Sequence, residues 1–188
     1  MRKHLIATGA AIVLAVSAAV ASSGDDERRG PNHFRATLTG YQETPSTIST
    51  GARGRFKAEL VTDALGMALE YELSYEGIEG GAPAGVTPVA FAAHIHLGAR
   101  ATSGGVSAFL CGNAATGVCP ASGGTVTGTI RPANVQGPAG QGIDPGEFDE
   151  LIRAMRAGAT YANVHSTPNR TGGEIRGQIL ARGDRDDH

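Results

Sequence analysis

The segment 67–76, Met-Ala-Leu-Glu-Tyr-Glu-Leu-Ser-Tyr-Glu, decides the fold class of this chain. Its large apolar side chains occupy the odd positions from Met67 to Tyr75, while glutamates and one serine occupy the even positions from Glu70 to Glu76. Residues two apart share a face of a β-strand, so this alternation predicts a strand with one buried and one solvated face. Such strands are typical of antiparallel sheets.

The same alternation recurs along the chain and predicts about eight strands. The further segments are 34–38, 56–60, 89–97, 106–110, 125–130, 160–166 and 174–180. Glycine-rich turns separate them: 28 of the 188 residues are glycine, about twice the usual share of roughly 7%. We therefore expect an all-β domain, an antiparallel β-sandwich or a barrel-like sheet.

One segment departs from this pattern and predicts a short helix near residues 145–157. Asp144 is placed as an N-cap, Pro145 as the first helical residue and Glu147 as the acid of a capping box. Apolar residues at helical spacing follow, and a glycine is placed to end the helix: Phe148, Leu151, Ile152, Met155 and Gly158.

Residues 1–21 have the pattern of a secretory signal peptide. Arg2 and Lys3 precede an uncharged run over 5–20, and small residues lead up to Ala21, after which we expect cleavage. The run is short and alanine-rich, whereas a membrane anchor needs about 20 strongly apolar residues. We therefore expect a secreted, periplasmic or extracellular protein with no stable membrane anchor after cleavage.

The mature chain is expected to form one domain over 33–181. The polar segments 22–32 and 182–188 are interpreted as a disordered leader and a disordered tail. The full chain carries 16 Lys+Arg and 18 Asp+Glu, a net charge of −2; removing two cations with the signal peptide leaves 14 against 18, or −4. Because this charge repels phosphate and no basic cluster with interleaved aromatics occurs, nucleic acid is excluded as a partner.

The only cysteines, Cys111 and Cys119, are expected to form a disulfide. An exported pair meets an oxidising compartment, and the seven intervening residues include two glycines that help to close a loop. The alternative, a two-thiolate metal site, lacks the close Cys-x-x-Cys spacing and further ligands beside it.

Three histidines are the candidate functional residues. His94 and His96 stand two apart in the strand 89–97, so both imidazoles point to one face. Strict alternation puts Phe91 and the other bulky residues of that strand on the opposite face, so the histidines are expected to point away from the main core. Two such imidazoles can chelate a transition metal, copper first and zinc second, and His165 could supply a third nitrogen. The alternative is that all three only make hydrogen bonds within or between sheets.

Glu174 and Arg176 share a face of the segment 174–180. Such a pair is ordinarily a solvated or interstrand salt bridge. The functional alternative is that Arg176 attracts anions beside the histidines, with Glu174 as its neighbour. Glu43, in the turn 42–45, could cap backbone amides or pair with a cation.

Five stretches together resemble the CHRD (chordin-type) domain family. In order along the chain they are 38–45 (Leu-Thr-Gly-Tyr-Gln-Glu-Thr-Pro), 51–60, 93–98 (Ala-His-Ile-His-Leu-Gly), 158–165 (Gly-Ala-Thr-Tyr-Ala-Asn-Val-His) and 173–179 (Gly-Glu-Ile-Arg-Gly-Gln-Ile). The resemblance implies an exported all-β domain, found singly in many bacterial proteins and as repeats in animal chordin, an extracellular antagonist of bone morphogenetic proteins. It implies no activity for the single-domain form, and chordin's growth-factor binding is attributed mainly to separate cysteine-rich modules that this chain lacks.

The His-Ile-His motif with the following Gly98 is also similar to the His-x-His strand of Cu/Zn superoxide dismutase. That enzyme's bridging histidine and second-metal aspartate have no match here. No nucleophile elbow, phosphate loop or dinucleotide fingerprint occurs. We therefore expect a binding or structural module that holds a transition metal, with a copper-dependent redox enzyme and an envelope or extracellular interaction scaffold as alternatives.

Overall fold

The computed structural model describes residues 30–79, 85, 87–169 and 172–182. The signal peptide predicted over 1–21 with its cleavage after Ala21, residues 22–29 of the predicted leader and residues 183–188 of the predicted tail lie outside the described residues and stay predictions. No helix in the described part of the chain is long and apolar enough to cross a membrane.

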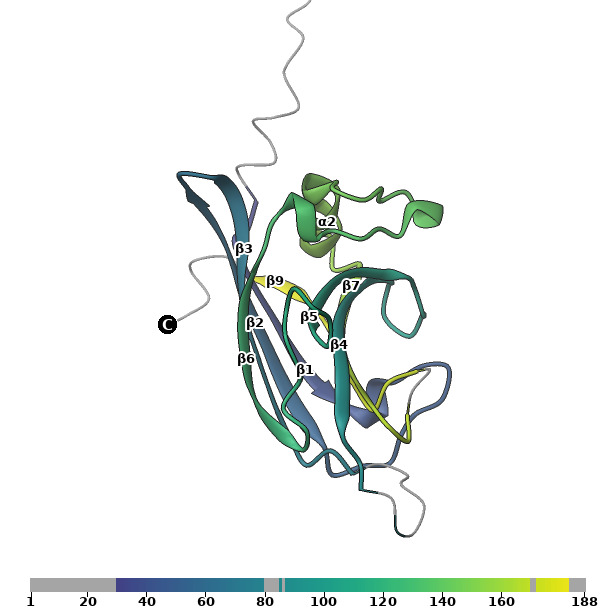
Figure 1. Cartoon of the computed structure of the whole chain (residues 1–188). Helices are drawn as coiled ribbons and strands as arrows, with labels where there is room; N and C mark the ends of the chain where they lie inside the picture. The colour runs from purple at the N-terminus through teal and green to yellow at the C-terminus, as the bar shows by residue number, and fades with distance from the viewer. Residues whose placement is uncertain (1–29, 80–84, 86, 170–171, 183–188) are drawn as a thin grey trace, which may run out of the picture.

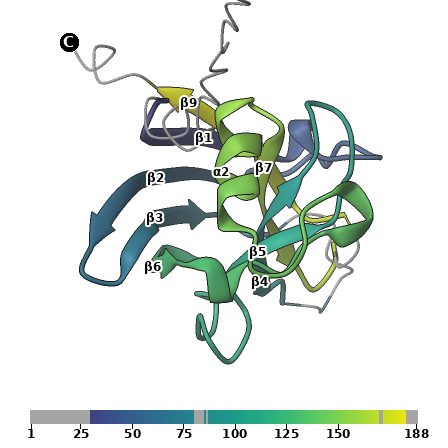
Figure 2. The same cartoon turned by 90° about the horizontal axis from the view of Figure 1, so that it is seen from above.

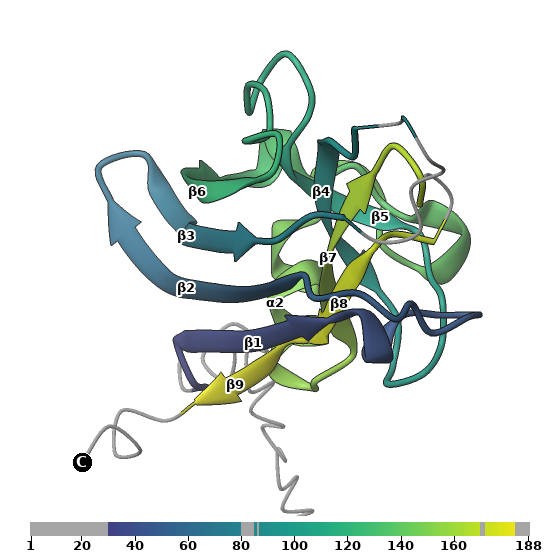
Figure 3. The same ribbon diagram turned by 90° about the horizontal axis from the view of Figure 1, so that it is seen from below.

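The described residues form one antiparallel sheet that is nearly closed into a barrel (Figures 1 and 3), as the alternation predicts. Its strands are β1 (His33–Thr39), β2 (Arg53–Asp63), β3 (Gly66–Glu76), β4 (Ala90–Leu97), β5 (Val106–Cys111), β6 (Gly123–Ile130), β7 (Thr160–Ser166), β8 (Ile175–Gln178) and β9 (Leu180–Arg182). The order is β5-β4-β7-β8-β1-β2-β3-β6, with β9 pairing β1 beside β8. The segment 174–180 thus divides into two strands, β8 and β9, which pair with opposite ends of β1.

Short 3₁₀ helices, η1 (Gly40–Gln42), η2 (Pro132–Asn134) and η3 (Ala139–Gln141), lie in the connections between strands. Alternate strand residues fill the interior of the barrel, as the period of two predicts. The large fully buried apolar residues include Phe34, Leu38, Phe56, Leu69, Leu73, Ile95, Leu110, Ile130 and Ile175.

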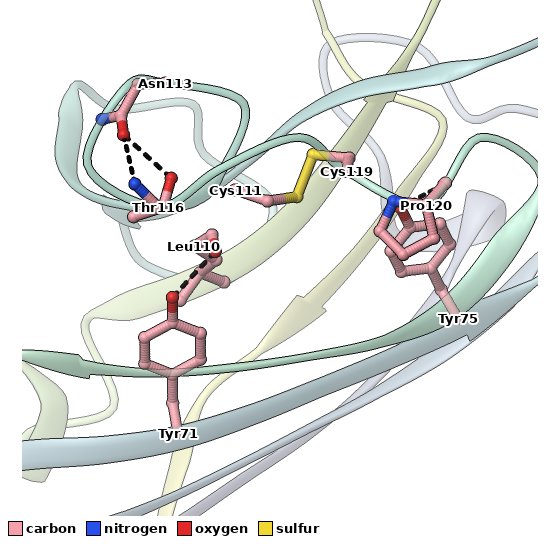
Figure 4. The surroundings of a disulfide bond; sticks show 8 residues. All are labelled: Tyr71, Tyr75, Leu110, Cys111, Asn113, Thr116, Cys119 and Pro120. Atoms are coloured by element: carbon pink, nitrogen blue, oxygen red, sulfur yellow. Dashed lines mark hydrogen bonds between the residues drawn. A yellow bond between two sulfur atoms is a disulfide. The ribbon is translucent and has the colours of Figure 1, made fainter.

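Tyrosines of β3 bridge the seam between the end strands β5 and β6 (Figure 4). The hydroxyl of Tyr71 donates to the carbonyl of Leu110 in β5 at 2.8 Å, and that of Tyr75 donates to the carbonyl of Pro120 at 2.6 Å. Gly128 of β6 pairs with Tyr71, and a Cβ at Gly128 would lie 2.5 Å from the tyrosine hydroxyl oxygen. The missing side chain on β6 therefore leaves the space through which the Tyr71 ring reaches β5.

A disulfide joins Cys111 to Cys119, as predicted, with their Cα atoms 5.2 Å apart. It closes a loop in which the Asn113 side-chain oxygen accepts hydrogen bonds from the backbone N–H groups of Ala115 and Thr116. The covalent bond and this turn anchor the loop at the end of β5 (Figure 4).

The helix α2 (Phe148–Arg156) lies across one end of the barrel (Figure 2) and buries its four predicted apolar residues. Its start was predicted three residues too early. Gly146 has a φ of +91°, a left-handed conformation that cannot belong to a right-handed helix, so Asp144 to Glu147 form a turn before it. Gly158, at φ +66°, follows the end of the helix as expected.

Candidate metal centre

The register of β4 and β7 brings the three histidines together. Cross-strand partners share a face of a sheet, and β4 pairs His94 with Asn163, His96 with Tyr161 and Ala92 with His165. Figure 3 shows β4 and β7 side by side near β5 and β8. His165, 69 positions beyond His96 in the sequence, therefore projects from the same face as the His-Ile-His pair.

The three imidazoles form a compact cluster. The ring centroids of His94 and His96 are 5.3 Å apart, those of His94 and His165 5.0 Å, and those of His96 and His165 6.2 Å. One ligand nitrogen from each ring lies within 4.8 Å of the other two. Two nitrogens bound to one tetrahedral ion at about 2.0–2.1 Å are roughly 3.4 Å apart, so the ligand atoms must approach one another by up to about 1.4 Å to bind one ion.

The histidines point away from the barrel core, as predicted, yet each is only 7–8% exposed. The prediction for Phe91 was wrong: a register shift between Ala90 and Ala92 interrupts the alternation, and Ala90 joins the core instead. The Phe91 ring then lies 6.0 Å from that of His165, while Phe109 of β5 packs edge-on against His94 at 4.5 Å.

Loops cover the cluster and leave a pocket of about 420 Å³ above it. The rings of His96 and His165 lie in its wall. Its other walls come from segment 44–48 before β2, from residues 103–104 before β5, and from 168–169 with 172–173 after β7. The site is therefore buried by loop segments on the outer face of the sheet, not by the core.

The loop before β5 orients His96. Its Nδ1 lies 2.9 Å from the Gly104 carbonyl oxygen, which can only accept, so Nδ1 carries the proton and Nε2 carries the lone pair. The Gly104 N–H in turn donates to the Tyr161 hydroxyl at 3.2 Å. Within the described residues, His96 Nε2 and His94 Nδ1 are buried without a hydrogen-bond partner. Metal-binding histidines are commonly fixed in this way, with one nitrogen bonded to a carbonyl and the other presented to the ion.

Burial also keeps the imidazoles of His94 and His96 uncharged. Desolvation, reinforced by the neighbouring His165 and His96, lowers the pKa of His94 to about 3. Desolvation lowers the pKa of His96 to about 4, against the opposing effects of its hydrogen bond to Gly104 and of the neighbouring Asn163 side chain. Both rings are neutral at pH 7, which is the form that binds a metal.

The family model of the CHRD domain matches residues 34–179 of this chain. The chain belongs to the CHRD family. The match covers most of the chain, from β1 to the residue after β8, and includes all three histidines and the disulfide. Neither a curated protein nor a solved structure matches the chain. Membership supports a structural or binding module, and an extracellular domain with a disulfide is consistent with secretion.

Arg176 of the CHRD domain, 2% exposed, ties the covering loops to the sheet. Its guanidinium donates to the carbonyls of Ala99 and Thr102 and to the hydroxyl of Thr44. It also lies 3.5 Å from the ring centroid of Tyr161, a cation–π contact. Arg176 therefore lies near the histidines, a position that an anion-attracting role would need. Its guanidinium, however, is hydrogen-bonded to the covering loops.

Tyr161 links Arg176 to the cluster. Its ring stacks on His96 with centroids 4.8 Å apart and planes 5° from parallel. Since β7 lies between β4 and β8, the histidine and the arginine reach this ring from the strands on either side of it. Tyr161 therefore restricts the rotation of the His96 ring.

The two acidic candidates are both buried near the covering loops. The Glu174 carboxylate accepts hydrogen bonds from the Thr50 hydroxyl at 2.8 Å and the Glu79 N–H at 2.9 Å, which fixes the segment before β8. Glu43 is 4% exposed, and burial raises its pKa to about 8 against the opposing charge of Arg176. A Cβ at Gly173 would lie 2.7 Å from both Glu43 Oε1 and Asn163 Nδ2, so these two side chains converge there.

Sequence reasoning missed Tyr161, Asn163 and Gly104. The sequence could have identified Tyr161 and Asn163, because a period of two in 160–166 puts them on the same face as His165. No pattern in the sequence around Gly104 indicates its role. That role depends on how the loop folds back, so that the Gly104 carbonyl meets the ring of His96, eight positions earlier in the chain.

Proposed function

We propose that this CHRD domain is an exported binding module that holds a transition-metal ion, copper first, with His94, His96 and His165. The observation that carries the proposal is the pair of buried nitrogens, His94 Nδ1 and His96 Nε2, in a three-histidine cluster. Leaving such a polar atom buried and unsatisfied costs about 1–3 kcal/mol. A bound cation would remove that cost at both atoms.

The donor set supports copper ahead of zinc. The cluster contains three imidazoles, and both cysteines are in the disulfide. Imidazole nitrogen binds copper, zinc, iron and nickel, and copper(II) is bound most strongly of the divalent first-row ions. Closed structural zinc sites ordinarily have four protein ligands, often thiolates, whereas three histidines with an open position also hold catalytic zinc. A copper ion bound here would supply one-electron redox chemistry or serve simply as cargo.

A redox enzyme acting on superoxide or a similar small oxidant is the second candidate. The pocket favours it, because His96 and His165 line that space and a small molecule could approach the ion there. Superoxide consumption by copper-loaded protein separates the two functions: turnover that is lost with His94→Ala identifies an enzyme, whereas retained copper without turnover identifies a binding module.

The proposal is tested by copper(II) titration of the untagged protein, followed by calorimetry and electron paramagnetic resonance. Wild type should bind one equivalent with nitrogen hyperfine structure, and the single alanine variants at His94, His96 and His165 should each lower the affinity at least tenfold. His33→Ala is the matched control, since His33 lies in β1 outside the cluster. An unchanged signal and affinity in His94→Ala would refute the proposal and leave the histidines a structural role, as an interaction scaffold predicts.

A further inference from the structure

The three histidines approach their common centre from one side. All project from β4 and β7 on the same face of the sheet, so a metal ion bound by them would have its ligands beneath it. Sites with three protein ligands keep a further coordination position for an exogenous group, whereas closed structural sites have four. That further position would face the side opposite the sheet.

That side is a hollow. The pocket of about 420 Å³ includes His96 and His165 in its wall, and its volume falls within the range of roughly 300–1,000 Å³ usual for small-molecule sites. At its rim the hydroxyls of Thr44 and Ser103 are hydrogen-bonded at 2.8 Å, joining the loops on two sides. The bond joins two of the loops that line the pocket, and the pocket has room for a small ligand.

The electrostatics of the pocket favour an anion. Among the described residues that line it, the side chains carry hydroxyl, amide, aromatic, apolar and imidazole groups, with neither a carboxylate nor an ammonium group. Three neutral imidazoles would leave both positive charges of a divalent ion uncompensated. The buried guanidinium of Arg176, behind Tyr161, adds a further positive charge. The carboxyl of Glu43 lies behind Gly173 of the pocket wall, and burial raises its pKa to about 8, so it is mostly uncharged at pH 7.

We propose that the metal ion held by the three histidines keeps one exchangeable coordination position facing this pocket, and that a small anion binds there. The inference rests on the proposed function and names the ligand class of the same site. The anion completes the coordination of the ion from the pocket side.

Azide is the probe, because its binding to copper(II) produces a charge-transfer absorption and changes the paramagnetic resonance spectrum. Copper-loaded wild type should show a saturable one-to-one azide titration with the copper retained after gel filtration. Ser46→Trp should fill the pocket and weaken azide binding at least tenfold without changing copper affinity, since Ser46 is an exposed residue of the pocket wall and is not one of the three histidine ligands. Ser49→Trp, three positions later in the same loop, is exposed and outside the pocket lining, and should behave like wild type.

The outcomes separate the two proposals. Wild-type protein that binds no copper overturns the proposed function and this inference with it. Wild type that binds copper but gives no azide titration, or loses its copper to azide, overturns this inference alone. Equal azide affinity in Ser46→Trp and Ser49→Trp also overturns it, because the anion would then bind outside the pocket.

Discussion

Replacing Gly104 with alanine should loosen the hydrogen bond that orients His96. A Cβ at Gly104 would lie 1.5 Å from the Leu97 carbonyl oxygen, which is backbone and cannot rotate aside. Ordinary contacts between such atoms begin near 3.5 Å, so the loop and the end of β4 must separate by roughly 2 Å. The Gly104 carbonyl, 2.9 Å from His96 Nδ1, would then move beyond hydrogen-bond distance.

The substitution should lower both the stability of the domain and its affinity for metal. Overpacking of this kind costs about 1–3 kcal/mol of unfolding free energy, which for a domain of this size lowers the melting temperature by about 2–12 °C. Loss of the partner that orients a metal-binding histidine lowers metal affinity about 10–100-fold, equivalent to about 1.4–2.7 kcal/mol. Gly104→Ala should therefore show both a lower melting temperature without metal and weaker copper binding at the same temperature.

Circular dichroism melting without metal and calorimetric copper titration measure the two effects. Gly140→Ala is the matched control, because a Cβ at Gly140 would meet nothing within 4 Å; its stability should stay within about 0.5 kcal/mol of wild type. If Gly104→Ala melts earlier but binds copper with wild-type affinity, the Gly104 carbonyl does not orient a metal ligand and that part of the reasoning is wrong.

Three further predictions concern the rest of the domain. The pKa of Glu43 is about 8 in the folded protein against an ordinary value of 4.5, so the folded state binds more protons between these pH values and Glu43 lowers stability as pH rises through that range. Glu43→Gln should therefore gain at least about 1 kcal/mol of unfolding free energy over wild type between pH 5 and pH 8 in urea unfolding. A difference that stays constant with pH would contradict this prediction. Replacing Cys111 and Cys119 with alanine opens a short loop and should cost about 2–3 kcal/mol of unfolding free energy, read from the urea midpoint; an unchanged midpoint would mean that the disulfide adds nothing to stability. Tyr71→Phe leaves a buried β5 carbonyl without its donor and should cost about 1–3 kcal/mol, whereas a neutral result would show that water replaces the hydroxyl.

Local pattern determined most of the fold. The alternation of apolar and polar residues in 67–76 fixes which face of β3 is buried, because the strand period of two is a property of the backbone alone. The same property puts His94 and His96 on one face without any tertiary information. It failed at Phe91, where a register shift moves the side chain to the histidine face, and at the start of α2, where Gly146 adopts a conformation that a helix excludes.

Only the tertiary structure decided the features that depend on contacts between distant segments. The pairing of β4 with β7 places His165 beside the His-Ile-His pair, and the loops over that face bury Glu43 and Arg176, which a sequence pattern treats as surface residues. The sequence by itself determined the strands, the disulfide partners and the identity of the three histidines. Their convergence, the lowered pKa values of His94 and His96, and the pocket above the cluster arise from strand register and loop packing, because burial is a property of the whole fold and not of any one segment.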